Sequence, residues 1–390
     1  MKESAIEPEG PLKGLKVLEL AGIGPGPLCA MLLSDLGANV LRIERNKPSQ
    51  LGTPRDPKFD LLRRNRPSVS VDLKKKEGIE TVLRLTRDAA VLIDPFRPGV
   101  TEKLGLGPDD CFSCNEKLVY ARMTGWGQYG PLSQVAGHDI NYLALTGILN
   151  AIGPKEGPVP PLNLVADMGG GAMFLAFGIM AAVYECQQSQ KGQVVDVSMT
   201  EGSAYLATGN FGLNAAGTWT NQRSDNILDG GAHFYGTYQT KDDLFIALGS
   251  IEAKFYLQLI EKLGMNPENL PDQMDRSKWP MMKQKFTEIF KTKTRKEWCE
   301  IFEGTDVCFA PVLTFEEAQH HPHNQSRGSF IEIDGVVQPG PVPRFSRTPP
   351  AFPSGPPGFG DDTETGLKAW GFSTQEVKEL SEKKAIGWQD

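Results

Sequence analysis

Short apolar runs recur along the first half of the chain, and helical segments separate several of them. Six runs predict strands because they are short and rich in Val, Ile and Leu; they span 15–20, 38–44, 67–73, 90–96, 118–125 and 192–199. The segments 27–37 and 75–89 have helical periodicity. Strands that alternate with helices are typical of a parallel sheet. The sequence therefore predicts an α/β fold whose large domain is Rossmann-like.

The second half of the chain has a different pattern. A long apolar helix is expected from about residue 170, and a second helical stretch over 201–219. A two-stranded meander and amphipathic helices follow, and then a Pro-rich extended segment with a short terminal helix. We expect four parts: the N-terminal part of the large domain (1–205), a linker (206–224), a smaller α+β domain (225–330), and an extended linker with a C-terminal segment (331–390) that the family resemblance given below returns to the large domain.

Composition narrows the choice of partners. The 390 residues include 41 Lys and Arg against 48 Asp and Glu, a formal net charge of −7. This charge argues against nucleic acid or an anionic membrane as the main partner. No apolar run approaches the roughly 18 uninterrupted residues of a membrane span. The first residues lack the apolar core of a secretory signal, and AIGWQD at the end is not a Ser-Lys-Leu-like address. A cytoplasmic location is expected, with peroxisome and mitochondrion left open.

No metal site is predicted. The six cysteines are scattered and form no disulfide framework. Cys111-x-x-Cys114 lacks a second pair at zinc-ribbon spacing. His320, His321 and His323 cluster around a proline, but no Cys or carboxylate partners them at ligand spacing. We expect ordinary thiols and a solvated histidine loop.

The glycine-rich turn AGIGPGP follows the first predicted strand and admits two interpretations. Gly22-x-Gly24-x-Gly26 between a strand and a helix, with Glu44 ending the next strand, is suggestive of dinucleotide binding. However, the third glycine is early, and two prolines remove backbone N–H donors that would hold a pyrophosphate. A tight turn with close approach of another segment is the favoured interpretation.

Basic residues gather in the first third of the chain: Arg42, Arg45, Arg63, Arg64, Arg66 and Arg97. Arginines at strand ends of an acidic protein are suited to phosphate, because each guanidinium offers a forked pair of donors. A solvated surface explains the same residues, and the pattern alone does not separate the two.

In PLNLVADMGGGAMF, Asp167 precedes three glycines and a long apolar helix. Asp167 could be an ordinary N-cap. Glycine inside a helix costs about 1 kcal/mol per residue, so Gly169, Gly170 and Gly171 call for another reason. We interpret them as backbone that a ligand must touch, with the helix N-terminus facing a developing oxyanion.

In GHDINYLALTG, His138 heads a short apolar helix. One interpretation is a helix start that happens to contain a histidine. The other is a catalytic base, since the positive end of a helix dipole favours the neutral ring. Glu252 in SIEAKFY is either a surface residue or the orienting partner of a histidine, and its position alone favours the surface.

Nine segments, in order over roughly residues 11–350, carry a family resemblance: GIGPGPLCAMLLSDLGA, FRPGVTEKLGLG, YARMTGWGQYGP, GHDINYLALTG, PLNLVADMGGG, KGQVVDVSM, DGGAHFY, GSIEAKFY and PVLTFEEA. The chain resembles the racemases of the family III CoA-transferase (CaiB/BaiF) superfamily. That resemblance implies an interlocked homodimer whose active sites are shared between subunits. It also implies a cofactor-independent isomerase that inverts the α-carbon of 2-methylacyl-CoA thioesters in branched-chain fatty acid or steroid side-chain metabolism.

The resemblance also assigns residues. His138 and Asp167 match the catalytic pair, which would exchange the α-proton through an enolate held by backbone N–H groups near Asp167 and the glycines. The surrounding network matches Asn163, Asp139, Tyr142 and Glu252. The CoA contacts expected are Arg45 and Arg97 on the phosphates, with Arg63, Gly169 and Gly170 beside them.

Three other functions compete with the racemase. A family III CoA-transferase would use Asp167 as a nucleophile that forms an acyl intermediate; His138 and Glu252 favour the racemase, because transfer needs no second proton-transfer residue. A dinucleotide-dependent oxidoreductase would be built on the Gly22–Gly26 turn. A non-catalytic CoA-binding protein is the weakest alternative. His233 in DGGAHFY departs from the proline expected there and lies near the expected site in sequence order.

Overall fold

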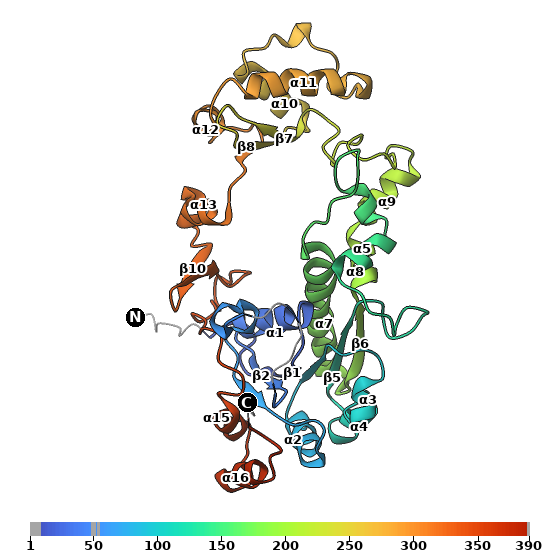
Figure 1. The fold of residues 1–390 in the computed structure, drawn as a ribbon, viewed down its shortest axis with the longest axis vertical. Coiled ribbons are helices and arrows are strands. Elements are labelled where there is room, and N and C mark those ends of the chain that lie inside the picture. The colour runs from blue at the N-terminus through green and yellow to red at the C-terminus, as the bar shows by residue number, and fades with distance from the viewer. Residues whose placement is uncertain (1–8, 48–51, 53–54, 388–390) are drawn as a thin grey trace. The chain divides into compact units, whose positions relative to one another are not determined.

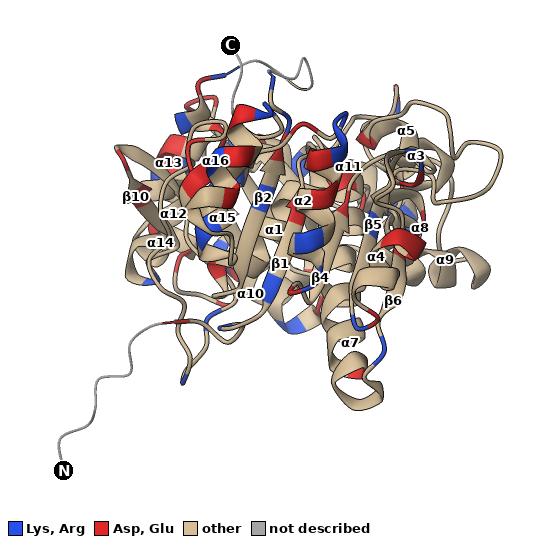
Figure 2. Ribbon diagram, turned by 90° about the horizontal axis from the view of Figure 1, so that it is seen from below, with Lys and Arg blue, Asp and Glu red and all other residues tan. Residues whose placement is uncertain are grey.

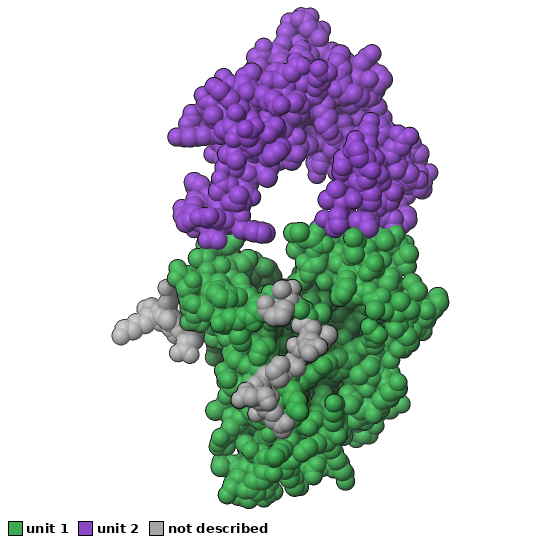
Figure 3. Space-filling view, viewed as in Figure 1, with its two compact units in different colours: residues 1–146, 162–206, 328–390 green, residues 147–161, 207–327 purple. Residues whose placement is uncertain are grey.

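The computed structural model describes residues 9–47, 52 and 55–387. The chain divides into two compact units, coloured separately in Figure 3. Unit 1 comprises residues 1–146, 162–206 and 328–390, and unit 2 comprises residues 147–161 and 207–327.

Unit 1 is built on a six-stranded sheet in the order β3-β2-β1-β4-β5-β6, with every neighbouring pair parallel. Its strands are β1 (Lys16–Leu20), β2 (Asn39–Glu44), β3 (Ser68–Ser70), β4 (Val91–Asp94), β5 (Val119–Thr124) and β6 (Gln193–Ser198). The central strands are buried on both faces, which explains their continuous apolar character. The order matches that of a Rossmann sheet and confirms the predicted α/β fold.

Short helices link these strands (Figure 1). They are α1 (Pro25–Asp35), α2 (Lys76–Thr86), α3 (Val100–Leu104), α4 (Pro108–Cys114), α5 (Asp139–Leu145) and α8 (Met199–Leu206), with short 3₁₀ turns at Pro57–Phe59 and Leu61–Arg63. Helix α1 begins two residues earlier than the expected Pro27. Two prolines fit its first turn because the N–H groups they lack are unpaired at a helix start.

The longest helical segment, Leu164–Ser189, begins as a π-helix, η3 (Leu164–Met173), and continues as α7 (Phe174–Ser189). By length and composition alone this segment could cross a membrane, with a mean hydropathy of 1.6 over its most apolar window. Within unit 1 this segment lies against β5 and β6, and a Cβ at Gly178 would come within 2.9 Å of Val195. Helix α7 carries almost no charge, whereas α2 and α16 (Thr374–Glu382) mix both signs (Figure 2).

The C-terminal segment returns to unit 1, as expected, and covers the outer edge of the sheet. Helix α15 (Thr363–Ala369) packs on β3, where Gly366 lies close to Val69. The side chains of Asp362 and Thr363 accept the N–H groups of Ser68 and Ser70 at 3.0 Å. The backbone donors of this edge strand are thus paired within the chain, which protects the edge from pairing with other strands. A hairpin, β10 (Phe330–Ile333) and β11 (Val336–Pro339), precedes this return; neither the hairpin nor α15 was predicted.

Unit 2 has its own sheet and its own core. The strands β7 (Tyr235–Gln239) and β8 (Phe245–Gly249) form the predicted meander, and β9 (Phe309–Pro311), which was not predicted, adds to β8. The helices are α6 (Ile148–Ala151), α9 (Thr208–Ala215), α10 (Ala253–Lys262), α11 (Trp279–Phe290), α12 (Arg295–Phe302), α13 (Phe315–His320) and α14 (Pro322–Ser326), with 3₁₀ turns at Pro267–Asn269 and Arg276–Lys278. The core is strongly aromatic and includes Phe234, Tyr238, Trp279, Phe286, Phe290, Trp298 and Phe302.

Two segments differ from the elements and domain boundaries that the sequence predicts. The stretch 201–219 is two helices, α8 and α9, that break at Ala207, and the division between the units falls at this break. Residues 147–161, expected within the N-terminal part of the large domain, group with unit 2.

Candidate active site

The carboxyl ends of the parallel strands carry the residues of interest in unit 1. In this strand order, the loops after β1 and β4 leave the sheet at the point where the order reverses, which is where α/β proteins bind ligands. The two loops touch, since a Cβ at Gly22 would lie 2.7 Å from the ring of Pro95. Gly24 has a positive φ of 69° and lies 3.4 Å, measured from its ideal Cβ, from Oδ2 of Asp167. The glycine-rich turn is therefore a tight turn with close approach, and it borders the Asp167 carboxyl.

His138 is the residue immediately before α5, and its exposed side chain does not cap the helix. Its backbone N–H donates to Oδ1 of Asn141 at 3.0 Å. Tyr142, one turn further on, is buried; its hydroxyl donates to the carbonyl of Gly137 at 2.5 Å, and its ring packs edge-on against Trp126. Burial raises the pKa of Tyr142 to about 12. Tyr142 thus fixes the backbone that presents His138.

Asp139 connects the His138 segment to the Asp167 segment. Its carboxylate is buried, and Oδ2 accepts the N–H groups of Ala166 and Asp167, each at 2.8 Å. These are donors that the start of η3 leaves unpaired. The backbone N–H of Asp167 is therefore already bonded to Asp139 in this structure.

Asp167 has an unusual electrostatic environment. Burial raises its pKa, the nearby charge of Asp139 raises it further, and a hydrogen bond from Asn163 (3.4 Å) and the nearby His138 lower it. The carboxyl lies in a π-helix, a rare conformation that occurs often at functional sites. His138, Asp139, Tyr142, Asn163 and Asp167 are therefore brought together, as the sequence predicted.

The glycines after Asp167 have a different explanation from the predicted one. Gly170 is buried, and a Cβ there would lie 2.6 Å from the backbone N of Ser203 in α8. A Cβ at Gly171 would meet Met199 and Pro25 at 2.9 and 3.1 Å. The run lets η3 pack directly on α8 and α1, and this packing explains Gly170 and Gly171 without a ligand. Gly169 is half-buried, with its Cβ direction facing Leu206.

The six arginines separate into two groups. Four are buried and paired with carboxylates: Arg42 with Glu19 and Glu44, Arg63 with Glu44, Arg64 with Asp35, and Arg66 with Glu19. Arg63, expected among the CoA contacts, has a side chain that is 2% exposed and stacks on Phe359. Arg45 and Arg97 are exposed, each just past the end of a strand.

Glu252 and His233 both lie in unit 2. Glu252 is the exposed N-cap residue of α10, and its side chain makes no capping hydrogen bond. His233 is 1% exposed within the aromatic core, where Nε2 is 2.8 Å from the hydroxyl of Tyr256. His233 is therefore a core residue of unit 2.

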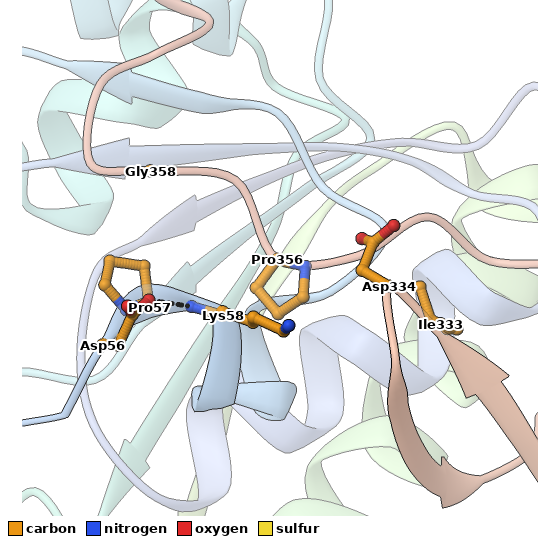
Figure 4. A pocket seen from close by; sticks show the side chains of 7 residues that line it. All are labelled: Asp56, Pro57, Lys58, Ile333, Asp334, Pro356 and Gly358. Atoms are coloured by element: carbon orange, nitrogen blue, oxygen red, sulfur yellow. Dashed lines mark hydrogen bonds between the residues drawn. The ribbon is translucent and has the colours of Figure 1, made fainter.

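A hollow of about 390 Å³ lies elsewhere on unit 1 (Figure 4). It is lined by Asp56, Pro57, Lys58, Ile333, Asp334, Pro356 and Gly358. The Lys58 side chain extends past Pro356, and Asp334 lies on the far side of Pro356 from Asp56 (Figure 4). Among the described residues, no group of three or more His, Cys, Asp or Glu could hold a metal ion.

Comparisons with known proteins identify the family of the chain that carries this site. The profile of CoA-transferase family III matches residues 12–363, and so spans the glycine-rich turn, the His138 and Asp167 segments and all of unit 2. The chain belongs to CoA-transferase family III. This family III chain is 48% identical over 380 residues to α-methylacyl-CoA racemase of Mus musculus, covering 96% of this chain and 97% of that protein.

Two further comparisons agree. The α-methylacyl-CoA racemase of Homo sapiens is 46% identical over 381 residues, covering 96% of this chain and 97% of that protein. A CAIB/BAIF family protein from Brucella suis has the same fold, with a TM-score of 0.80 and 23% identity over 93% of this chain and all of that chain.

One residue of this family III chain escaped the sequence analysis. Asp94, the last residue of β4, is buried and gathers hydrogen bonds around the loop that carries Arg97. The sequence feature that could have pointed to Asp94 is an acidic residue at the end of an otherwise apolar strand, directly before a Pro-Phe-Arg-Pro-Gly turn.

Proposed function

We propose that the chain is a racemase that inverts the α-carbon of 2-methylacyl-CoA thioesters by 1,1-proton transfer. The observation that carries the proposal is the pairing of two proton-transfer groups, His138 and Asp167, from segments that Asp139 fastens together. Two relatives nearly half identical over almost the whole chain, both named α-methylacyl-CoA racemase, support it.

The reaction needs a base on one face of the α-carbon and an acid on the other. One group removes the α-proton, the C–H electron pair moves into a carbon–carbon double bond, and the carbonyl oxygen becomes an enolate. The other group then delivers a proton to the opposite face as the carbonyl re-forms. The burial that raises the pKa of Asp167 suits this exchange, because an acid–base group is most effective when its pKa approaches the working pH.

The neighbouring residues position this pair. Tyr142 holds the backbone before His138, Asp139 holds the start of η3, and the Asn163 amide donates to the Asp167 carboxyl. The enolate oxygen would be stabilised by the positive end of η3, and the N–H of Asp167 would serve it only as a donor shared with Asp139. The role of Glu252 in steadying the His138 ring is a proposal that rests on the sequence resemblance.

The CoA nucleotide is the handle that places the thioester. Arg45 and Arg97 are the arginines we propose for its phosphates, because both are exposed at the carboxyl edge of the sheet. Proton transfer between two side chains needs no other reagent, so we propose a cofactor-independent reaction. The cytoplasmic location expected from the sequence stays a prediction, which fractionation of expressing cells tests.

We also propose a homodimer. Unit 1 exposes large apolar side chains along η3, α7 and α8: Met173, Phe177, Tyr184, Tyr205 and Leu206 are between 52% and 75% exposed. Large apolar side chains exposed along neighbouring helices favour an interaction surface. Sedimentation of the purified protein should therefore give twice the mass of the 42.7 kDa chain.

Incubation with a 2-methylacyl-CoA in D₂O tests the reaction. We expect deuterium to enter the α-position, and the configuration to scramble, without any acceptor acid. If label enters only slowly while CoA moves to an added carboxylic acid, the chain is a transferase in which Asp167 attacks the thioester carbonyl and expels the CoA thiolate. Saturable NAD(P)H binding would instead favour the oxidoreductase.

A further inference from the structure

A buried aspartate ends β4 directly before the loop that carries Arg97. Asp94 is 2% exposed, and its carboxylate collects donors from three segments. Oδ1 accepts the N–H of Phe96 at 2.9 Å, and Oδ2 accepts the hydroxyl of Thr101 at 2.9 Å. The hydroxyl of Tyr120, from the neighbouring strand β5, lies 3.2 Å from Oδ2 and shares its one proton between this oxygen and the carbonyl of Leu106 at 2.9 Å.

These contacts fasten both ends of one loop, residues 95–99, which we call the Arg97 loop. Phe96 lies before Arg97, and Thr101 lies in the first turn of α3, just after the loop. Arg122 from β5 completes the arrangement: Nε lies 3.5 Å from Oδ2 of Asp94, and the guanidinium also pairs with Glu102 of α3. One carboxylate therefore holds the start and the end of the Arg97 loop against the sheet.

The Arg97 loop is also held from the outside. Pro95 packs against Gly22 of the glycine-rich turn, and the side-chain amide of Gln134 donates to the carbonyl of Pro98 at 3.1 Å. Gln134 lies four residues before His138. The loop is thus fixed relative to both segments that border Asp167, whereas the Arg97 side chain is exposed and makes no hydrogen bond or ion pair with the residues that the structure describes.

We propose that Asp94 is a positioning residue for substrate binding: it sets the place and direction of the Arg97 guanidinium for the phosphates of the CoA nucleotide. This inference rests on the proposed function, because it takes the substrate to be a CoA thioester. Because the Arg97 loop is already fixed, substrate binding does not have to order it. A shift of the guanidinium by about 1 Å would be enough to lose much of the effect of its contact with phosphate.

Asp94→Asn tests the proposal, because it keeps the volume but cannot accept donors from both sides of the loop. We expect the Kd for free CoA, measured by calorimetry, to rise between about 10-fold and 100-fold. The KM for a 2-methylacyl-CoA should rise alike, with kcat for α-deuterium exchange unchanged. The matching pantetheine thioester, which lacks the nucleotide, should react as with the unsubstituted protein.

Two controls separate positioning from loss of structure. Asp72→Asn alters the same type of turn after β3, where Oδ1 accepts the N–H of Lys74 at 3.0 Å, and should leave CoA affinity unchanged. In an Arg97→Ala background, Asp94→Asn should weaken CoA binding no further. If Asp94→Asn does not fold, Thr101→Val removes one of the same hydrogen bonds and should weaken CoA binding in the same direction.

Several results would overturn the proposal. They are an unchanged CoA affinity in Asp94→Asn (or in Thr101→Val, where that variant stands in), an equal loss with the pantetheine thioester, or full additivity with Arg97→Ala. Failure of the proposed function is distinguishable: the unsubstituted protein would then show no exchange, while the calorimetric comparison of CoA affinities still decides the role of Asp94.

Discussion

Two regions of the molecule present a histidine near a tyrosine, and they differ in what surrounds the pair. In unit 1, His138 is exposed, and the hydroxyl of Tyr142 supports the backbone beside it rather than the ring. In unit 2, His233 is enclosed by Phe234, Tyr256 and Phe286, and its ring bonds to Tyr256 directly.

The comparison shows how burial decides the chemistry that the same residue type can perform. Burial lowers the pKa of His233 to about 4, because the aromatic core cannot solvate an imidazolium, so the ring stays neutral near pH 7. The His138 side chain, by contrast, is exposed to solvent, and it lies close enough to Asp167 for the two to interact electrostatically. A histidine that transfers a proton must be accessible to the substrate. The ring of His233 is not accessible, because aromatic side chains enclose it.

The largest expected effect separates the two histidines by activity. We expect His138→Ala and Asp167→Asn each to lower α-deuterium exchange by about 10³-fold or more, because each removes one of the two proton-transfer groups. Thermal unfolding should change little, since both side chains are at least partly exposed. His323→Ala, at another exposed histidine, is the control and should exchange normally. Exchange retained in both variants would remove these residues from the site.

The next largest effect is on the pH dependence of stability, to which the buried His233 should contribute. The pKa of His233 is about 4 in the folded chain and near its ordinary 6.5 when unfolded. Its neutral form therefore contributes fully above pH 6.5, and that contribution is lost as the pH falls from 6.5 toward 4. The loss should approach about 3 kcal/mol in the free energy of unfolding of unit 2. Denaturant unfolding at several pH values measures it, and His233→Phe should flatten the dependence; an equally steep curve in that variant would assign it to other groups.

The fold was largely predictable from the sequence, because the buried strands of unit 1 are continuous apolar runs. What escaped prediction has a physical reason. The strand β9 is only three residues long and gains its place from pairing with β8. Helix α15 is short and is held by contacts with β3, nearly 300 residues away in sequence, which no local pattern records.

The candidate site was drawn partly from local patterns and partly from the family resemblance, which paired His138 with Asp167. His138 and Asp167 stood out because polar groups headed apolar helices. The glycines beside Asp167 were assigned to a ligand, whereas Gly170 is required by the approach of Ser203. The sequence alone could not tell which arginines are buried in ion pairs and which are exposed. The pairing of Arg42 with Glu19, for example, depends on the register of two neighbouring strands.

A smaller effect compares the two tyrosines. Tyr142→Phe removes the hydrogen bond to Gly137, and we expect kcat to fall about tenfold because His138 loses its fixed backbone. Tyr256→Phe leaves the His233 ring with no hydrogen bond among the described residues, because Nδ1 is already unpaired. That variant should lose about 1–2 kcal/mol of stability and keep its exchange rate. Chemical denaturation and exchange assays on both variants check the pair, and equal effects on activity would contradict it.

The smallest effect is a shift in pH dependence at Asp139. The Asp139 charge raises the pKa of Asp167, so for the substrate hand whose proton Asp167 removes, activity falls as the pH drops through that raised pKa. Asp139→Asn keeps an oxygen that can accept the N–H groups of Ala166 and Asp167 but removes the charge. The acid limb of the kcat/KM profile should therefore move to lower pH, with a fold of unchanged stability at neutral pH. Asp196→Asn, which removes an exposed carboxylate of β6, should leave the limb in place. A limb that stays fixed in Asp139→Asn would mean that Asp139 acts through geometry alone.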